Sequence, residues 1–185
     1  VLVQGDTNTA LIAAITANKL GIPVAHVEAG LRSYDLRMPE EFNRRLIDNL
    51  SALIFAPSLR AKNILESERV VGEIYLTGNT IIDVVIKFAP VAERKSQILN
   101  EIPLERNEYI LFTAHRAENV DNYKVLRQFI LFFKESPLPI VYPIHPRTKK
   151  RLQEYRLWDK LNKITNLYIL PPVGYLDFLV LLNYL

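Results

Sequence analysis

The sequence alternates between apolar runs of strand length and longer stretches with helical periodicity. In the first half, the runs of strand length are VLVQG, IPVAHVEAG, ALIFAPS and EIYLTG. Each is followed by a stretch whose apolar residues recur with the spacing of one helix face, which is typical of an amphipathic helix. Because such alternation builds parallel strands connected by helices, the sequence predicts an α/β fold with open parallel sheets buried on both faces.

The alternation is interrupted once, by a polar stretch that contains Pro90 and Pro103. After it the pattern restarts with YILFTAH and continues through PIVYPIH and NLYILPP, each followed by a predicted helix. We therefore predict two Rossmann-like parallel-sheet units. The first covers residues 1–88, a linker covers 89–106, and the second unit covers 107–185.

Composition narrows the class of protein. The chain has 185 residues, of which 49% are hydrophobic, so it can bury a sizeable core. Its 23 basic and 20 acidic residues leave a net charge of only +3, which does not favour nucleic-acid binding. The absence of cysteine excludes disulfides, thiolate metal ligands and cysteine nucleophiles. Since no apolar run reaches transmembrane length and no signal-peptide pattern opens the chain, we expect a cytoplasmic protein without membrane contacts.

Both ends of the sequence look cut. The chain begins without methionine inside a strand-like run and stops inside FLVLLNYL, an apolar helical pattern without a C-cap. We therefore expect a piece of a longer protein, in which each of the two units is incomplete.

Titratable side chains stand where predicted strands end. Asp6 follows the first strand, Glu28 ends the second, and His115 and His145 end two strands of the later half. In open parallel sheets, ligands bind beyond the carboxyl ends of the strands. We expect a cleft between the two units to gather these four groups.

Each of these residues also has an ordinary structural interpretation. Asp6 precedes a helix and is suited to be its N-cap. Glu28 closes an apolar strand, where a carboxylate is costly to bury unless it is paired or functional, and Arg32 is the available ion-pair partner. A single histidine such as His115 is as often structural as catalytic. Arg147, close behind His145, lies in the first turn of a predicted helix whose N-terminus attracts anions.

The stretch MPEEFNRRLIDNL is predicted to begin a helix. Pro39 suits the first helical position, and Glu40 and Glu41 complement the helix dipole. The start of a helix does not explain why the polar run continues through residues 43–45.

Several chemistries have no support in the sequence. The six glycines form neither GxGxxG nor a P-loop, and there is no GxSxG. With three histidines and no cysteine, no metal-binding spacing emerges, and His26 is expected in the core of a strand. The remaining carboxylates and imidazoles are suited to acid/base catalysis, without a metal or cofactor.

A set of short motifs carries a resemblance to a known family. In chain order they are QGDTNT, HVEAGLRS, MPEEFNR, LTGNTIID, TAHRAEN, PIHPR and PPVGYLDFLVLL. Together they resemble the non-hydrolysing UDP-N-acetylglucosamine 2-epimerases. The resemblance implies a glycosyltransferase-B-type pair of Rossmann-like units with the active site between them, a homodimer, and a protein about twice this long. The segments outside this sequence would then include a GTRPE-like loop and a Ser-Gly-Gly segment for the nucleotide.

The resemblance also implies a reaction. The C2 proton of an N-acetylglucosaminyl group has no adjacent carbonyl that would acidify it, so direct abstraction is implausible. The family instead eliminates UDP across C1 and C2 to give 2-acetamidoglucal and adds UDP back with protonation on the opposite face. This route interconverts UDP-N-acetylglucosamine (UDP-GlcNAc) and UDP-N-acetylmannosamine (UDP-ManNAc) without a cofactor. It needs carboxylates near C2 and groups that stabilise the departing diphosphate.

Motif by motif, the resemblance assigns site residues. The implied catalytic residues are the carboxylates Asp6, Glu28 and Glu40, and His115, which assists UDP departure. The implied substrate-binding residues are Arg116, Glu118, Asn119, His145 and Arg147, of which the last two serve the nucleotide or a neighbouring regulatory site. The sequence has HRAEN where many members have HRREN, so Ala117 removes one positive charge from this loop.

Two other functions fit the same fold. A glycosyltransferase would pass the sugar to an acceptor and leave the C2 hydrogen untouched, and a hydrolysing relative would release free ManNAc and UDP. A third possibility is that the piece is not catalytic by itself, in which case residues 1–185 alone should bind UDP weakly.

Overall fold

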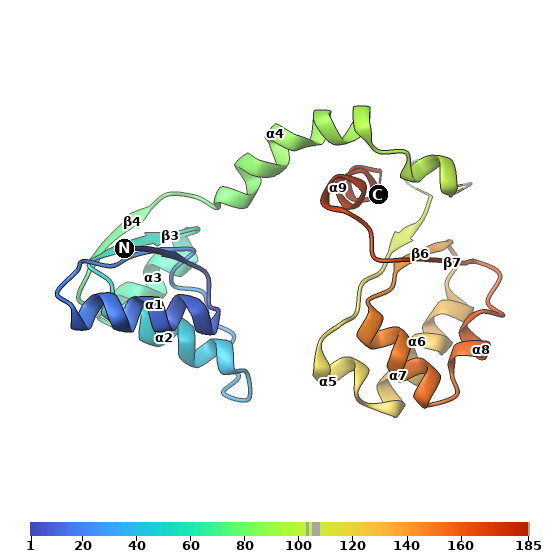
Figure 1. The fold of residues 1–185 in the computed structure, drawn as a ribbon, viewed down its shortest axis with the longest axis horizontal. Helices are drawn as coiled ribbons and strands as arrows, with labels where there is room; N and C mark the ends of the chain where they lie inside the picture. The colour runs from blue at the N-terminus through green and yellow to red at the C-terminus, as the bar shows by residue number, and fades with distance from the viewer. Residues whose placement is uncertain (103, 105–107, 185) are drawn as a thin grey trace. The chain divides into compact units, whose positions relative to one another are not determined.

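The computed structural model describes residues 1–102, 104 and 108–184. The chain divides into two compact units, Val1–Val84 and Val85–Leu185 (Figure 1). Each contains one parallel sheet with helices between successive strands, which confirms the predicted α/β class with two parallel-sheet units. In the described part of the chain, no helix is both long and apolar enough to cross a membrane.

The first unit has a four-stranded sheet in the order β1-β2-β3-β4, and every neighbouring pair is parallel. Its strands are β1 (Leu2–Gln4), β2 (Ala25–Val27), β3 (Leu53–Ala56) and β4 (Glu73–Leu76). The helices that follow them are α1 (Asn8–Lys19), α2 (Pro39–Leu50), α3 (Leu59–Ser67) and the start of α4 (Thr80–Lys95). Since all the connections are strand, helix, strand, the carboxyl ends of the strands meet at one edge of the sheet.

Local sequence signals fix where these helices begin. The Thr7 hydroxyl accepts a hydrogen bond from the Ala10 N–H (3.2 Å), so Thr7 is the N-cap of α1. The Ser58 hydroxyl caps α3 in the same way through the Ala61 N–H (3.2 Å). Pro39 is the first residue of α2, as predicted. Helices α1 and α3 therefore begin within a few residues of the preceding strand, whereas residues 28–38 separate β2 from α2.

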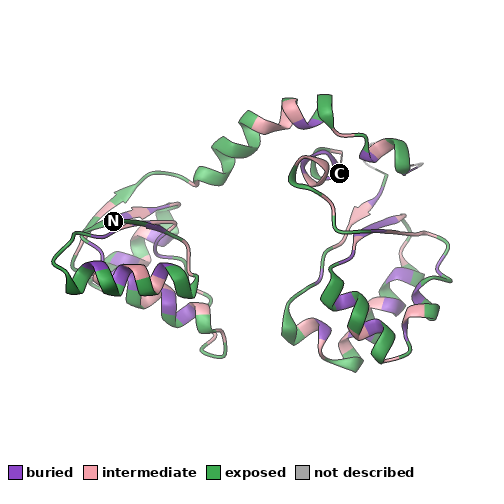
Figure 2. Ribbon diagram, viewed as in Figure 1, coloured by how far each residue is buried: buried purple, intermediate pink, exposed green. Residues whose placement is uncertain are grey.

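The core of the first unit is built from small side chains. On α1 the buried residues are Ala10, Ala14 and Ala17, which belong to a cluster with Val3, Val24 and Ile47. Figure 2 shows α1 as alternating buried and exposed segments, as expected for a helix with one face on a sheet. A second cluster joins the strands to α3, where a side-chain Cβ at Gly30 would lie 2.6 Å from the Ala61 carbonyl oxygen. Glycine is therefore required at position 30 for α3 to pack this closely.

The second unit has a three-stranded parallel sheet in the order β5-β6-β7. Its strands are β5 (Ile110–Leu111), β6 (Ile140–Pro143) and β7 (Leu167–Leu170). Its helices are η1 (Ile98–Glu101, a 3₁₀ helix), α5 (Ala117–Val120), α6 (Tyr123–Glu135), α7 (Pro146–Glu154), α8 (Trp158–Leu161) and α9 (Tyr175–Asn183). The helix predicted to follow PIVYPIH is α7, and a second short helix, α8, lies between it and β7.

Aromatic packing dominates the core of the second unit. The Phe112 ring lies edge-on to Phe129, Phe133 and Tyr142, with ring centroids 5.2, 4.9 and 5.0 Å apart. Tyr142 and Phe133 are both 1% exposed. Such edge-to-face contacts add to the free energy of apolar burial.

The segment expected to be a linker contains regular structure. Helix α4 continues through Pro90 to Lys95, whereas the sequence predicted a linker from residue 89 onwards. Pro90 removes one backbone donor from the helix, but the next turn buries Ala92 in a cluster with Ile98 and Ile102, which keeps the segment packed. Residues 103, 105–107 and 185 lie outside the described residues, so the limits 1–88, 89–106 and 107–185 stay a prediction.

Candidate active site

Asp6 lies directly after β1, and its carboxylate is held by an arginine of α2. Arg44 donates to the Asp6 carboxylate from Nε (2.8 Å) and from a terminal nitrogen (2.7 Å). The Asn43 side-chain amide donates to the backbone carbonyl of Asp6 (2.8 Å). The interpretation of Asp6 as an N-cap is wrong, because Thr7 occupies that position. Asp6 is instead a positioned, partly exposed carboxylate.

Glu28, directly after β2, has an unusual backbone. Its φ of 71° lies in the left-handed region, which costs a residue other than glycine about 1–3 kcal/mol and occurs most often at functional sites. Glu28 lines one cavity with Gly5, Asp6, Leu31 and Arg44. We call this the carboxylate cavity. The structure thus brings Asp6 and Glu28 together at the carboxyl ends of β1 and β2.

The alternative interpretation of Glu28, as the ion-pair partner of Arg32, is wrong. The fully buried Arg32 guanidinium binds Asp48 (2.8 Å) and Glu68 (2.6 Å). Burial lowers the pKa of Arg32, but the hydrogen bond to Glu68 and the charge of Asp48 outweigh burial and raise it overall. Arg32 is therefore committed to the interior, and Glu28 faces the cavity without it.

Asp48 connects Arg32 to His26. The Nδ1 atom of His26 lies 2.7 Å from the Asp48 carboxylate, and Nε2 lies 2.9 Å from the Gly5 carbonyl oxygen. Because a carbonyl oxygen only accepts, Nε2 carries a proton and donates it. His26 is 1% exposed, which confirms that it belongs to the core. The same Asp48 accepts a hydrogen bond from the Gly30 N–H (3.3 Å), so Asp48 holds the loop after β2 directly and the loop after β1 through His26.

The two acids that open α2 have different environments. Glu41 is 0% exposed and accepts hydrogen bonds from the Ser33 N–H (2.8 Å), the Ser33 hydroxyl (2.9 Å) and two arginines, Arg44 and Arg45 (both 3.2 Å). Burial raises the pKa of Glu41, but these hydrogen bonds, first those from Ser33, outweigh it and lower the pKa to about 2. Glu41 is therefore a structural anchor. Glu40, partly exposed, is not among the residues that line the carboxylate cavity.

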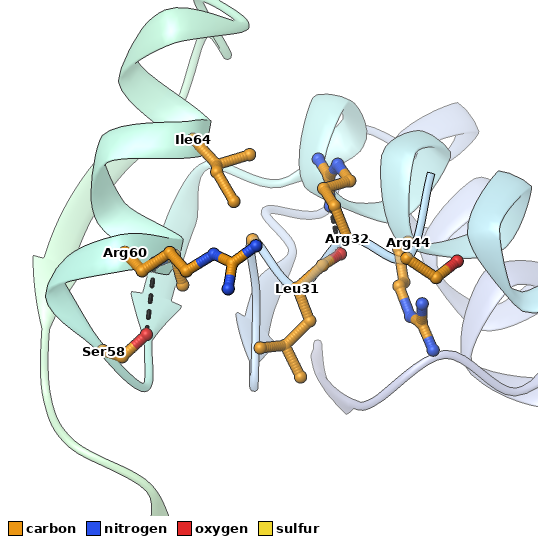
Figure 3. A pocket seen from close by; sticks show the side chains of 9 residues that line it. Leu31, Arg32, Arg44, Ser58, Arg60 and Ile64 are labelled. Carbon is orange, nitrogen blue, oxygen red and sulfur yellow. Dashed lines mark hydrogen bonds between the residues drawn. The ribbon is translucent and has the colours of Figure 1, made fainter. Parts of the chain in front are cut away.

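A second cavity of the first unit is rich in arginine (Figure 3). Its volume is about 230 Å³, and it is lined by Gly30, Leu31, Arg32, Ser33, Arg44, Ser58, Arg60, Ala61 and Ile64. We call it the arginine pocket. Leu31 and Arg44 line both this pocket and the carboxylate cavity, so the two are adjacent.

In the second unit, the two predicted histidines lie side by side. His115 follows β5, His145 follows β6, and their ring centroids are 5.9 Å apart. Both line a cavity of about 330 Å³ together with Thr113, Ala114, Pro143, Ile144, Pro172, Val173 and Phe178. His145 is also the N-cap of α7, since its Nδ1 accepts a hydrogen bond from the Arg147 N–H (3.1 Å). His115 is exposed, as a group that meets a substrate must be.

The other predicted binding residues do not line this histidine cavity. Arg116 and Glu118 are exposed and form a loose ion pair at 3.9 Å, and Asn119 lies in the short helix α5 with them. Arg147 instead forms an ion pair with Asp121. Hydrogen bonds from Arg147 and then from Arg151 lower the pKa of Asp121. Among the described residues, no three histidines, cysteines, aspartates or glutamates are grouped as a metal site would require.

Comparison with known protein families shows which family the chain belongs to. The family model described as UDP-N-acetylglucosamine 2-epimerase matches residues 1–184. The chain belongs to this family. The resemblance inferred from the motifs is confirmed, and so is the glycosyltransferase-B-type fold, because a solved member of the family superposes on the chain.

That solved structure is the UDP-GlcNAc 2-epimerase of Methanocaldococcus jannaschii in complex with UDP-GlcNAc and UDP. It matches with a TM-score of 0.86 and 45% identity over 99% of this chain and 52% of the other. The curated protein of that name from the same organism is 47% identical over 98% of this chain. The UDP-2,3-diacetamido-2,3-dideoxy-D-glucuronate 2-epimerase of Pseudomonas aeruginosa is 38% identical over 99% of this chain and 50% of its own length. The chain thus spans about half the length of the curated relatives it matches.

Several residues that build the site were missed from the sequence. Arg44 orients Asp6, and Asp48 joins the loops after β1 and β2, yet neither was a candidate. A signal was available, because Glu41, Arg44 and Asp48 follow one another at helical spacing and share a face of α2 with the buried Ile47. Polar residues on a buried helix face must be paired, so this pattern indicates an ionic network.

Proposed function

We propose that the whole protein is a non-hydrolysing UDP-GlcNAc 2-epimerase, which interconverts UDP-GlcNAc and UDP-ManNAc. The observation that carries the proposal is the carboxylate cavity. Asp6 and Glu28 come from two adjacent strand ends and line the same cavity, beside the guanidinium of Arg44. Proton transfer on both faces of a sugar carbon requires more than one positioned acid/base group, and two carboxylates meet that need.

The proposed reaction removes the C2 proton with one carboxylate while UDP leaves from C1, which gives 2-acetamidoglucal. A second carboxylate then protonates C2 on the opposite face as UDP returns to C1. Asp6, Glu28 and Glu40 are the proposed proton-transfer residues, and no cofactor takes part. The left-handed backbone at Glu28 and the ion pair of Arg44 with Asp6 support this assignment. Both hold a carboxylate in position, and pre-organised groups lower the reaction barrier without rearrangement.

His115 is the proposed residue that assists the departure of UDP. Its exposed ring lines a cavity with His145, and an imidazole at this position can donate a hydrogen bond or a proton to a leaving phosphate oxygen. Arg116, Glu118 and Asn119 are proposed to shape the diphosphate side of the site. His145 and Arg147 are proposed to contact the nucleotide or a neighbouring regulatory substrate. We also expect the whole protein to be a cytoplasmic homodimer, which light scattering after size-exclusion chromatography would test.

The test uses the whole protein in D₂O with UDP-GlcNAc. We expect UDP-ManNAc to form and deuterium to enter C2, both followed by proton NMR. Changing Asp6 to Asn should lower kcat by at least about 100-fold, the typical contribution of general acid–base catalysis. The matched control is Asp35→Asn, which removes an exposed carboxylate of the same unit that pairs with Arg37.

The same experiment separates the alternatives. Transfer of the sugar to an acceptor without deuterium at C2 would identify a glycosyltransferase. Release of free ManNAc and UDP would identify a hydrolysing relative. Turnover of UDP-GlcNAc with no C2 exchange, or full activity in Asp6→Asn, would contradict the proposal.

The family includes proteins named for different sugars. One relative reported above is named for UDP-GlcNAc and another for a UDP-linked diacetamido-glucuronate. The proposed elimination involves C1 and C2 of the sugar. It is compatible with both UDP-linked sugars, because neither sugar requires a different reaction at these two carbons. The groups that surround the rest of the sugar ring therefore determine which substrates are accepted.

A further inference from the structure

All the charged residues that line the arginine pocket are basic. Three of its lining residues, Arg32, Arg44 and Arg60, bring guanidinium groups, and Ser33 and Ser58 bring hydroxyls. None of the nine lining residues is acidic. A lining with basic and hydroxyl groups and no carboxylate is suited to an anion, provided that one of the basic groups is not already paired.

The three arginines differ in how far their charge is compensated. Arg32 binds Asp48 and Glu68, and Arg44 binds Asp6 and Glu41. In the part of the chain that the structure describes, no ion pair or hydrogen bond engages the Arg60 guanidinium.

Figure 3 shows the Arg60 side chain extending from α3 across the pocket in the direction of Leu31. The pocket therefore holds one guanidinium whose five donors are free for a ligand.

The pocket lies where a ligand of this sheet is expected. Residues 30–33 follow β2 and Ser58 follows β3, so the pocket is at the carboxyl ends of these strands. It is adjacent to the carboxylate cavity through Leu31 and Arg44. A sugar whose C2 lies at Asp6 and Glu28 can therefore place another ring substituent in the arginine pocket.

We propose that the arginine pocket binds a carboxylate on the hexose of the substrate and that Arg60 is the residue that recognises it. The whole protein then accepts a UDP-linked N-acetylhexosaminuronate in addition to UDP-GlcNAc. This inference rests on the proposed function, because it uses the position of the sugar at the carboxylate cavity. A planar guanidinium can donate two parallel hydrogen bonds to a carboxylate. The neutral hydroxymethyl group of UDP-GlcNAc cannot accept such a pair.

The test compares two substrates that differ only at C6, UDP-GlcNAc and UDP-N-acetylglucosaminuronate. For each, kcat/KM for C2 deuterium exchange and Kd by calorimetry are measured with the whole protein. Arg60→Gln should lower the specificity ratio, uronate over neutral sugar, by about 10-fold or more, since a hydrogen-bonded charge is lost to one substrate only. Arg60→Lys, which keeps the charge but not the fork, should recover part of that ratio.

The matched control is Lys62→Gln. Lys62 lies two residues after Arg60 on the same helix, pairs with Glu66 at 3.7 Å and does not line the pocket, so its loss removes one positive charge from α3 without touching the ligand. The specificity ratio should not change in this variant. Arg60 and Lys62 are both on a helix surface, so neither change is expected to prevent folding.

The outcomes separate this inference from the proposed function. If Arg60→Gln weakens both substrates equally, Arg60 binds the diphosphate that they share, and the inference is wrong. If it changes neither, the inference is also wrong, while C2 exchange with UDP-GlcNAc still supports the epimerase. If no sugar exchanges its C2 hydrogen, the proposed function fails, and the ratio of the two Kd values then decides whether the pocket recognises a carboxylate.

Discussion

The two units position their candidate residues by different means. In the first unit, the loops after β1 and β2 are held by buried polar and ionic side chains: His26, Asp48 and Glu41 are all 1% exposed or less. In the second unit, the strands that precede His115 and His145 lie on a core of aromatic and aliphatic side chains, and the ion pairs of Asp121 are partly exposed. The stability of the first unit therefore depends on buried polar and ionic pairs, and that of the second depends on the close packing of apolar side chains.

This difference determines how each unit should respond to change. Removing one partner of a buried ionic network leaves another charge unpaired in the interior, which is strongly destabilising. Removing a buried apolar side chain leaves a cavity whose cost depends on how far its surroundings relax. Removing an exposed charge leaves its partner in water at little cost. The four predictions below test these three cases, from the largest expected effect to the smallest.

The largest effect is expected for Asp48→Ala. The change leaves the buried guanidinium of Arg32 and the ring of His26 without their shared partner, so we expect a loss of about 3–5 kcal/mol in the free energy of unfolding. Urea unfolding followed by circular dichroism measures it, and hydrogen exchange with mass spectrometry shows whether the first unit opens. A loss below about 1 kcal/mol would show that buried pairing does not hold this unit together.

The second effect is expected for Leu126→Ala in the second unit. Leu126 is 1% exposed within the aromatic cluster, and its loss should cost about 2–4 kcal/mol through the cavity left behind. The effect should be nearly the same at low and high salt, because no charge is involved. Hydrogen exchange confined to the second unit would support the comparison, and opening of the first unit instead would contradict it.

The third effect is acid destabilisation of the first unit. The pKa of Glu41 falls from its ordinary value of 4.5 to about 2 in the folded protein, so the unfolded chain binds more protons between these values. The stabilisation by Glu41 is complete above pH 4.5 and is lost as pH falls towards 2. Urea titrations across this window measure the slope for the wild type. Glu41→Gln should be less stable at neutral pH and should lose stability less steeply in acid.

The smallest effect is expected for Asp121→Ala. The ion pairs of Asp121 with Arg147 and Arg151 are partly exposed, so their loss should destabilise the protein far less than Asp48→Ala, and the effect should shrink further in high salt. The change matches Asp48→Ala in chemistry, since both remove a carboxylate that contacts two basic side chains. Equal losses in the two variants would show that burial is not what distinguishes the units.

The predictable part of the fold was its periodicity. Alternating apolar runs and helical stretches predicted the parallel sheets, and turn chemistry predicted the start of α2 at Pro39. The errors arose where local rules competed with packing. Pro90 did not end α4, because the following turn is packed. Thr7, and not Asp6, is the N-cap of α1. Both residue types form N-caps, and only the fold shows which side chain accepts the hydrogen bond.

For the candidate site, the sequence predicted which residues follow the strand ends, but not the side chains with which they pair. The structure brings Asp6 to Glu28 and His115 to His145, and both meetings follow from the geometry of parallel sheets. The partners of these residues were not predictable, because pairs such as Arg32 and Glu68 are far apart in sequence and meet only after folding. The catalytic and binding roles of all the candidate residues stay predictions: Asp6, Glu28, Glu40, His115, Arg116, Glu118, Asn119, His145 and Arg147.

The backbone at Glu28 has a consequence for engineering this protein. Glycine would adopt the same φ of 71° without steric conflict, so Glu28→Gly would relax the chain at this point while removing its carboxylate. A search for more heat-resistant variants that scores folding alone would therefore tend to select against a proposed catalytic group. Screens for robustness should hold position 28 fixed or assay turnover in parallel.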